Sequence, residues 1–186
     1  GPQCRVHGEL STSVLLGFCN KSHDGFVGHS VLGHWTNLGA GTITSDLKNN
    51  YSNVRTFASA ADWLEGKGTD SGQRLLGLTV GDYTKTGIGA TFPTGAVVGI
   101  GCNLYGTALQ PTYVPSFVWG TPDALVEHRI TDMIETAARA MERRKIEFRV
   151  EYDSLIRQAF DDTSAERGCY LAAAAGRVAA PSRGRG

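Results

Sequence analysis

Mostly apolar residues recur at every sixth position through the middle of the chain. Between residues 80 and 104 the pattern holds for five consecutive repeats, and glycine or proline follows four of them. Similar repeats, some with steps of five, occupy residues 10–39. The uninterrupted repeats are Val80, Thr86, Phe92, Val98 and Leu104, and the earlier ones are Leu10, Leu16, Ser22, Val27, Leu32 and Leu38.

A period of six argues against an α-helix, because a 3.6-residue turn spreads such repeats around the helix. It is typical of a triangular prism of short strands, in which each strand places one side chain inside and glycine relieves the following turn. The sequence therefore predicts an all-β fold, a left-handed parallel β-helix, with the repeats from Val80 to Leu104 in its interior. Such coils need the left-handed crossover that ordinary βαβ units avoid.

The repeats divide the chain into three parts. We expect the β-helix over residues 1–110, with a long polar loop inserted at about 46–79. Inserted loops of this length are usually functional or disordered, and this one is a candidate for covering a site or reaching a neighbouring subunit. Residues 111–160 are expected to form an exit segment and C-terminal helices, and the Ala/Gly/Arg-rich residues 161–186 a disordered tail.

The exit segment carries the sequence of a helix start at Thr121-Pro122-Asp123, with a hydroxyl cap, a proline and an acid. We therefore predict a helix over 121–145, whose apolar stripe packs back on the β-helix or on a neighbouring chain. A shorter helix is expected to follow near residues 152–160.

The composition limits the classes of partner that the chain is expected to bind. Lys and Arg number 18 and Asp and Glu number 18, so a neutral chain is not expected to bind nucleic acid or a membrane surface. No apolar run approaches the ~20 residues of a membrane span, and four scattered cysteines are typical of reduced thiols in the cytoplasm. The chain begins at Gly1 without a signal pattern, which we interpret as the middle of a longer gene product.

The segment from Asn20 to Thr44 reads NKSHDGFVGHSVLGHWTNLGAGTIT. It resembles the hexapeptide-repeat acetyltransferase domain of the bifunctional enzymes that make UDP-N-acetylglucosamine, which pair a catalytic His with an NIGAGTIT-like stretch. The segments Lys21–Phe26, Ser45–Tyr51 and Pro115–Gly120 look most like a bacterial subfamily of sugar nucleotidyltransferases. Those proteins carry a front nucleotidyltransferase domain, which we expect to be missing from this chain, and Mg²⁺ is expected only with that domain.

The resemblance implies an acetyl-CoA-dependent N-acetyltransferase that acts on an amino-sugar 1-phosphate, as a homotrimer with sites between subunits. Counting back from Asn37 without a gap places His23 on the family's catalytic base, and Glu9 on a nearby Glu that orients it. A surface His on a turn is the alternative for His23, and a structural asparagine for Asn37. A solvated loop charge is the alternative for Lys48 and for Arg55. The expected substrate-binding residues are Asn37, Asp46, Lys48, Asn50, Tyr51 and Arg55, and the expected cofactor-binding residues are Ala40, Gly87, Ile88 and Gly106.

Four positions depart from the family pattern. Asp46 replaces an Asn, and an ionised carboxylate cannot donate a hydrogen bond to an oxyanion. Ser11 replaces a Lys, Phe26 an aromatic hydroxyl and Ile88 a Ser of the implied pocket. These changes favour an altered acceptor, or the alternative function of a non-catalytic trimerisation and regulatory β-helix for a sugar-1-phosphate nucleotidyltransferase.

A metal site is the remaining rival. His29 and His34 are five apart, a spacing also used by zinc carbonic anhydrases of this fold. Both His residues fall two positions after a repeat, on the outer turn, which favours surface histidines and no metal.

Overall fold

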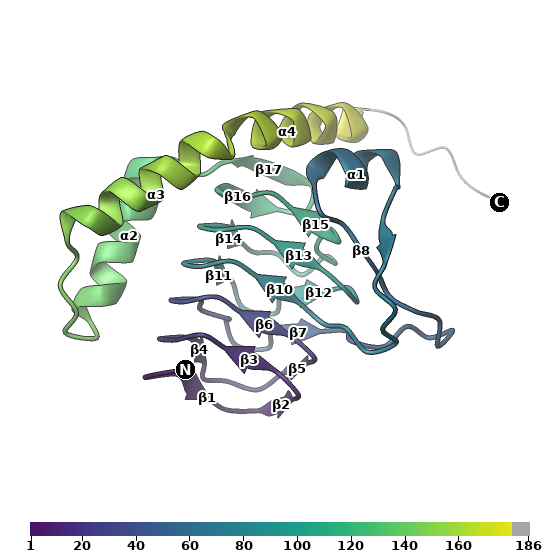
Figure 1. The fold of residues 1–186 in the computed structure, drawn as a ribbon, viewed down its shortest axis with the longest axis horizontal. Helices are drawn as coiled ribbons and strands as arrows, with labels where there is room; N and C mark the ends of the chain where they lie inside the picture. The colour runs from purple at the N-terminus through teal and green to yellow at the C-terminus, as the bar shows by residue number, and fades with distance from the viewer. Residues whose placement is uncertain (180–186) are drawn as a thin grey trace.

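A computed structural model describes residues 1–179 of the chain. Short parallel strands stack into a prism with three faces, and helices cover one side and one end of it (Figure 1). The first face contains β1 (Arg5–Val6), β4 (Asn20–Lys21), β11 (Lys85–Thr86), β14 (Asn103–Leu104) and β16 (Val118–Thr121). The second contains β2 (Glu9–Ser11), β5 (Phe26–Gly28), β7 (Ile43–Thr44) and β12 (Thr91–Phe92), and the third β3 (Val14–Leu15), β6 (Val31–Leu32), β10 (Thr79–Val80), β13 (Val97–Val98) and β15 (Tyr113–Val114).

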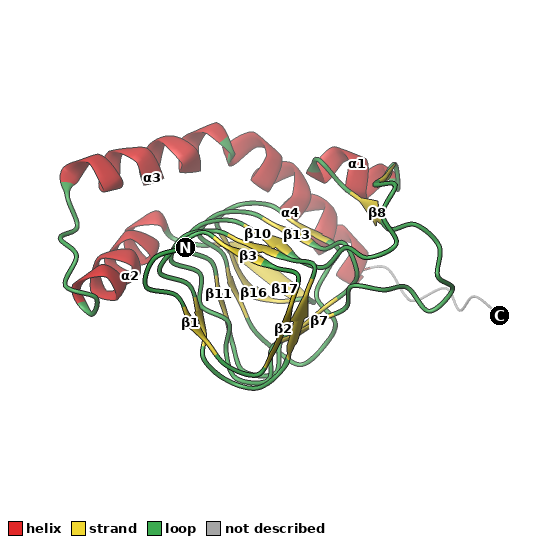
Figure 2. Cartoon of the chain, turned by 60° about the horizontal axis from the view of Figure 1, so that its bottom comes forward, coloured by secondary structure: helices red, strands yellow, loops and turns green. Residues whose placement is uncertain are grey.

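The hand of the coil can be followed in Figure 2, where the N-terminal coil faces the reader. The chain passes from β1 to β2 to β3 counterclockwise while successive coils recede from the viewer. A counterclockwise path that recedes is a left-handed coil. The predicted fold class, a left-handed parallel β-helix with a C-terminal helical extension, is confirmed.

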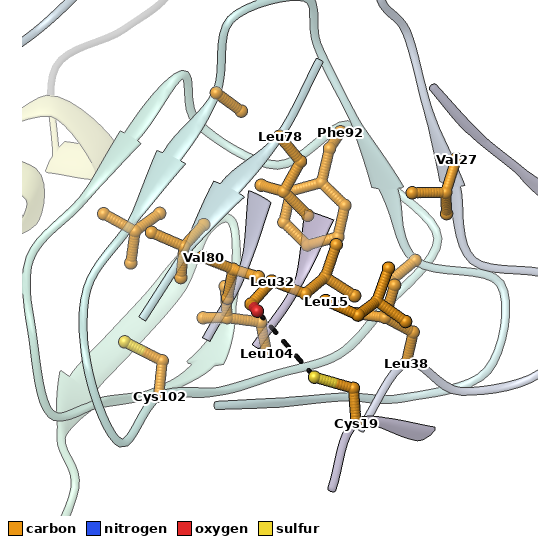
Figure 3. Packing of buried hydrophobic residues seen from close by; sticks show 14 of the residues in the cluster. Leu15, Cys19, Val27, Leu32, Leu38, Leu78, Val80, Phe92, Cys102 and Leu104 are labelled. Carbon is orange, nitrogen blue, oxygen red and sulfur yellow. Dashed lines mark hydrogen bonds between the residues drawn. The ribbon is translucent and has the colours of Figure 1, made fainter. Parts of the chain in front are cut away.

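The interior is filled by one side chain per strand, stacked in register from coil to coil (Figure 3). On the third face Leu15 pairs with Leu32, Leu32 with Val80, Val80 with Val98, and Val98 with Val114. All five repeats between residues 80 and 104 are buried, as predicted. The ladders explain why the period is strict, because a one-residue slip turns a strand's side chains to the other face.

The first coils depart from the expected phase. Leu16 is 42% exposed and Ser22 half-buried, whereas Leu15 and Lys21 are buried. The turn between the second and third faces is one residue shorter here, so the interior step from Leu10 to Leu15 is five. The expected repeats at Leu16 and Ser22 were therefore wrong by one position.

The β-helix also continues past residue 110. The strands β15 and β16 pair in parallel with β13 and β14, so the expected exit segment completes another coil. Thr121-Pro122-Asp123 does not begin a helix, because β16 turns there into the antiparallel strand β17 (Ala124–Glu127). Pairing in the hairpin satisfies backbone groups that a helix start would leave without partners.

Helix α2 (Ile130–Glu142) follows the hairpin and lies along the side of the prism. Met133 and Ala137 pack against Phe117, with Tyr83 and Ile100 of the β-helix beside them. The apolar stripe thus packs back on the β-helix, as predicted. The helix begins at Ile130, however, and not at residue 121. Helix α3 (Val150–Asp162) packs on α2 through Ile156.

Helix α4 (Ser164–Ala179) occupies residues expected to be a disordered tail, so that expectation was wrong for this segment. Buried Arg167 donates to Glu127 at 2.8 Å and lies over the ring of Phe160. Glu166 accepts from the Tyr113 hydroxyl at 2.7 Å, and Tyr170 is buried. These contacts fix a helix whose alanine-rich composition gave no sign of them; Arg183 and Arg185 of the expected tail lie outside the described residues.

The inserted loop runs from β7 to β10 and contains β8 (Arg55–Thr56), α1 (Ala60–Glu65) and β9 (Thr69–Asp70). Strands β8 and β9 form an antiparallel hairpin. The Ala60 amide donates to Glu166 of α4 at 2.7 Å, so the far part of the loop is held by its own chain. No helix within residues 1–179 is long and apolar enough to cross a membrane.

If ladder packing stabilises the prism, Leu32→Ala should lower the free energy of unfolding by about 3 kcal/mol, because it leaves a cavity between two coils. Leu32 is 0% exposed, whereas Leu155 on α3 is 67% exposed. The matched control Leu155→Ala should cost less than about 1 kcal/mol. Chemical denaturation followed by circular dichroism measures both, and equal losses would contradict the assigned interior.

Candidate functional site

The turns that lead from the first face to the second stack along one edge of the prism, which we call the first corner. Ala40 accepts the Gly89 amide at 2.7 Å, which joins the turns of two successive coils. Gly25 has φ +110°, and a Cβ there would collide with the carbonyl of Thr42 in the next coil. Glycine is therefore required where the turns approach most closely.

The turn at residues 22–25 presents His23, which is exposed. The Nζ of fully buried Lys21 donates to the carbonyls of His7 at 3.1 Å, of Asp24 at 3.0 Å and of His23. Burial lowers the pKa of the Lys21 ammonium, but three carbonyls satisfy its donors. Lys21 thus fixes the backbone that carries His23.

Beside this turn, the first face and the C-terminal end of α2 enclose a cleft of about 420 Å³, which we call the basic cleft. Four cations line it, and no Asp or Glu is found among its described lining residues. Two of the expected site residues, His23 and Asn37, open on it together. The lining residues are Arg5, Phe18, Asn20, Ser22, His23, Trp35, Thr36, Asn37, Lys85, Ala140, Arg143 and Arg144.

Asparagines bridge two coils on the floor of the basic cleft. The Ser22 hydroxyl donates to Asn20 Oδ1 at 2.6 Å, and Asn20 Nδ2 donates to Asn37 Oδ1 at 2.7 Å. No described residue accepts a hydrogen bond from Asn37 Nδ2. The relay therefore fixes Asn37 with its amide donor available to a ligand, although the same bonds also serve the β-helix.

Lys85 is the cation closest to the core. It is half-buried on β11, and its Nζ donates to the Trp35 carbonyl at 3.3 Å. Burial lowers the pKa of the Lys85 amine to about 8. An adjacent anion would favour its charged form.

Glu9 lies exposed on β2 in register with Phe26 of β5, on the second face. No hydrogen bond joins Glu9 to His23 in the described structure, so the geometry leaves its orienting role a prediction. The four expected cofactor-binding residues all lie on or beside the first corner, above the His23 turn. Ile88 is the most exposed of them, at 77%, and Gly106 has φ +92°.

The other expected substrate residues lie elsewhere, at and beyond the start of the inserted loop. Asp46 is 2.7 Å from His29 Nδ1, and Lys48 donates to the Asn53 carbonyl at 3.3 Å. Asn50 accepts from Ser52, and Tyr51 is 67% exposed. The Arg55 guanidinium makes two hydrogen bonds to the Gly68 carbonyl, at 3.0 and 2.6 Å, which fix the β8–β9 hairpin.

The histidines do not gather. His29 contacts Asp46, and His34 lies 3.7 Å from Asp82. Within the described residues, no group of three or more His, Cys, Asp or Glu side chains is placed to hold a metal ion.

Several residues of the cleft were not expected from the sequence. Arg143 and Arg144 follow the apolar stripe of the predicted helix, where cations also suit a helix C-terminus, and Arg5 and Lys85 carry no repeat or motif signal. The fold brings them together from coil one, coil four and α2. Lys21 occupies an interior position, which the six-residue rule assigns to aliphatic side chains.

The fold is a left-handed β-helix built from hexapeptide repeats, and the chain is similar to curated proteins of one kind. The bifunctional sugar-1-phosphate nucleotidylyltransferase/acetyltransferase of Sulfurisphaera tokodaii is 31% identical over 97 residues, which are 52% of this chain and 23% of that protein. The bifunctional protein GlmU of Methanocaldococcus jannaschii is 32% identical over 94 residues, which are 50% of this chain and 21% of that protein. No protein-family model matches the chain.

A second bifunctional protein GlmU, from Methanococcus maripaludis, is 33% identical over 91 residues, which are 49% of this chain and 20% of that protein. The resemblance to bifunctional nucleotidyltransferase/acetyltransferases is therefore confirmed. The matches span less than a quarter of the length of these relatives. The narrower resemblance to a bacterial subfamily stays a prediction.

Proposed function

We propose that the chain is an acetyl-CoA-dependent N-acetyltransferase domain that acts on an amino-sugar 1-phosphate in cytoplasmic nucleotide-sugar synthesis. The observation that carries the proposal is that His23 and Asn37, from successive coils, open on one cationic cleft. The expected cofactor-binding residues lie along the first corner, beside the same cleft. The names of the relatives, which combine a sugar-1-phosphate nucleotidylyltransferase with an acetyltransferase, support the same chemistry.

In the proposed reaction, the amino nitrogen of the sugar attacks the thioester carbonyl of acetyl-CoA. A C–N bond forms, the C–S bond breaks, and the thiolate leaves. His23 accepts the proton that the attacking amine must lose, because a neutral imidazole is a suitable base near neutral pH. Lys21 keeps the His23 turn in place, and Asn37 offers its amide donor to the acceptor.

Replacing His23 with Ala should lower turnover by about 10²–10⁴, the usual contribution of a general base. Acetyl-CoA affinity should barely change, because the base acts on the acceptor. The matched control is His34→Ala, since His34 is an exposed histidine that does not line the cleft. A thiol-release assay with amino-sugar 1-phosphates measures turnover, and equal rates for wild type and His23→Ala would exclude His23 as the base.

The same assay distinguishes the transferase from the alternative, non-catalytic function. Asp46 is engaged by His29 and offers a carboxylate where the family has an amide donor, which favours a non-catalytic trimerisation and regulatory β-helix. No thiol release with any acceptor, together with no thermal shift on adding acetyl-CoA, would establish that alternative over the transferase.

We also propose that the chain acts as a homotrimer. The loop residues from Asp46 to Arg55 follow the second face, whereas His23 precedes it, so a second copy is needed to bring a loop to the first corner. The outer side of the third face offers apolar surface for such contacts. Val14 and Val31 are paired in register there and are 54% and 41% exposed.

Light scattering at micromolar protein should give three times the mass of one chain. Val14→Lys with Val31→Lys should lower that mass without unfolding the prism, because both side chains point out of the core. The control is a pair of lysines at exposed positions of α3, Leu155→Lys and Val150→Lys. A wild-type mass of a single chain would contradict the shared site.

A further inference from the structure

The basic cleft concentrates positive charge in a chain whose total formal charge is zero. Arg5 and Lys85 reach it from the first face, and Arg143 and Arg144 from the end of α2. None of these four cations forms an ion pair with a described residue. Exposed arginines elsewhere on the same helices do find acids, as Arg139 does with Glu135 at 2.9 Å.

A helix C-terminus alone attracts cations, which is the simpler account of Arg143 and Arg144. That account leaves Arg5 and Lys85 unexplained, because they come from the β-helix and face the same space. The Arg144 guanidinium also donates to the Gln3 carbonyl at 3.1 Å, which ties the end of α2 to the first coil. The helix is thus fixed with its cations over the first face.

The cations that line the basic cleft repel one another. Burial, with repulsion from Arg5 and then from Arg143, lowers the pKa of the Arg144 guanidinium. Burial lowers that of Lys85 to about 8. An anion in the cleft would relieve both effects, since opposite charge favours the protonated forms.

Two aromatic rings also line the basic cleft, and both lie in turns that lead from the third face to the first. Phe18 and Trp35 stack with centroids 4.2 Å apart and planes 6° apart. Both have positive φ, 54° and 62°, as Tyr83 and Phe117 have at the equivalent turns of later coils, so this conformation belongs to the β-helix turn. Phe18 remains half-buried, so part of its surface is open to the ring of a ligand.

We propose that the basic cleft is a binding site for a phosphate monoester, with Arg5, Lys85, Arg143 and Arg144 as its cations and Phe18 beside the attached ring. The class of ligand follows from the proposed function. The inference adds Arg143 and Arg144, which lie outside the β-helix, to the residues that bind this ligand. Arginine pairs match the geometry of phosphate oxygens, and the amide donor of Asn37 adds a further hydrogen-bond donor to the lining.

Two ligands of the proposed reaction carry such a group, the sugar 1-phosphate and the 3′-phosphate of coenzyme A. Calorimetric titration of the full chain with glucosamine 1-phosphate, adenosine 3′,5′-bisphosphate and inorganic phosphate distinguishes them. Tighter binding of the sugar phosphate assigns the cleft to the acceptor, and tighter binding of the bisphosphate assigns it to the coenzyme. Either result supports a phosphate monoester site, and glucosamine without phosphate should bind in neither case.

Arg143→Gln should weaken the preferred ligand about tenfold, because a charge-assisted hydrogen bond is lost. Arg143 is the exposed C-cap residue of α2, and its guanidinium makes no hydrogen bond or ion pair with a described residue, so the variant should fold normally. The matched control Arg139→Gln removes a cation of the same helix outside the cleft and should leave affinity unchanged. Equal affinity in Arg143→Gln and wild type would overturn the site.

A second measurement uses the wild-type chain alone, so it does not depend on whether a variant folds. NMR titration of the lysine amines should show the Lys85 signal titrating near pH 8 without ligand and at higher pH with saturating phosphate monoester. An unmoved titration at saturation would place the ligand elsewhere. Because binding is measured without acetyl-CoA, phosphate binding with no thiol release would refute the transferase and keep the site, whereas thiol release without phosphate binding would do the reverse.

Discussion

The interior ladder is the constraint on which the rest of the structure depends. Each strand must place one side chain in the prism above the equivalent side chain of the preceding coil, as Leu32 does between Leu15 and Val80. This stacking brings every turn into register with the turn one coil away. Residues far apart in the sequence then become neighbours along one edge, and the first corner has its row of candidate site residues because of that geometry.

The ladder is broken once in a way that bears on function. Lys21 fills an interior position, and its ammonium is satisfied by three carbonyls around the His23 turn. A buried charge is tolerated only with such partners, and here they hold the turn that presents the candidate base. The helical extension adds the second element, because α2 carries its arginines across the first face and closes the basic cleft.

The sequence predicts what periodicity encodes. The prism, its interior residues from Val80 to Leu104 and the packing of α2 follow from the six-residue repeat and the apolar stripe. The helix at α4 was missed because Arg167 and Tyr170 are held by partners distant in sequence, which local composition does not report. The cleft was half predicted: His23 and Asn37 followed from a motif, whereas Arg5, Lys85 and Arg143 meet only when coils and helix are packed together.

The central claim is that one edge of the prism, with the basic cleft beside it, is where an amino-sugar phosphate and acetyl-CoA meet. A crystal structure of the chain with glucosamine 1-phosphate and coenzyme A tests it most directly. The account predicts the phosphate among the cations of the cleft, the amino group facing His23 and the coenzyme along the first corner. Both ligands bound away from His23, or seated only on the inserted loop at Lys48 and Arg55 of a single copy, would contradict it.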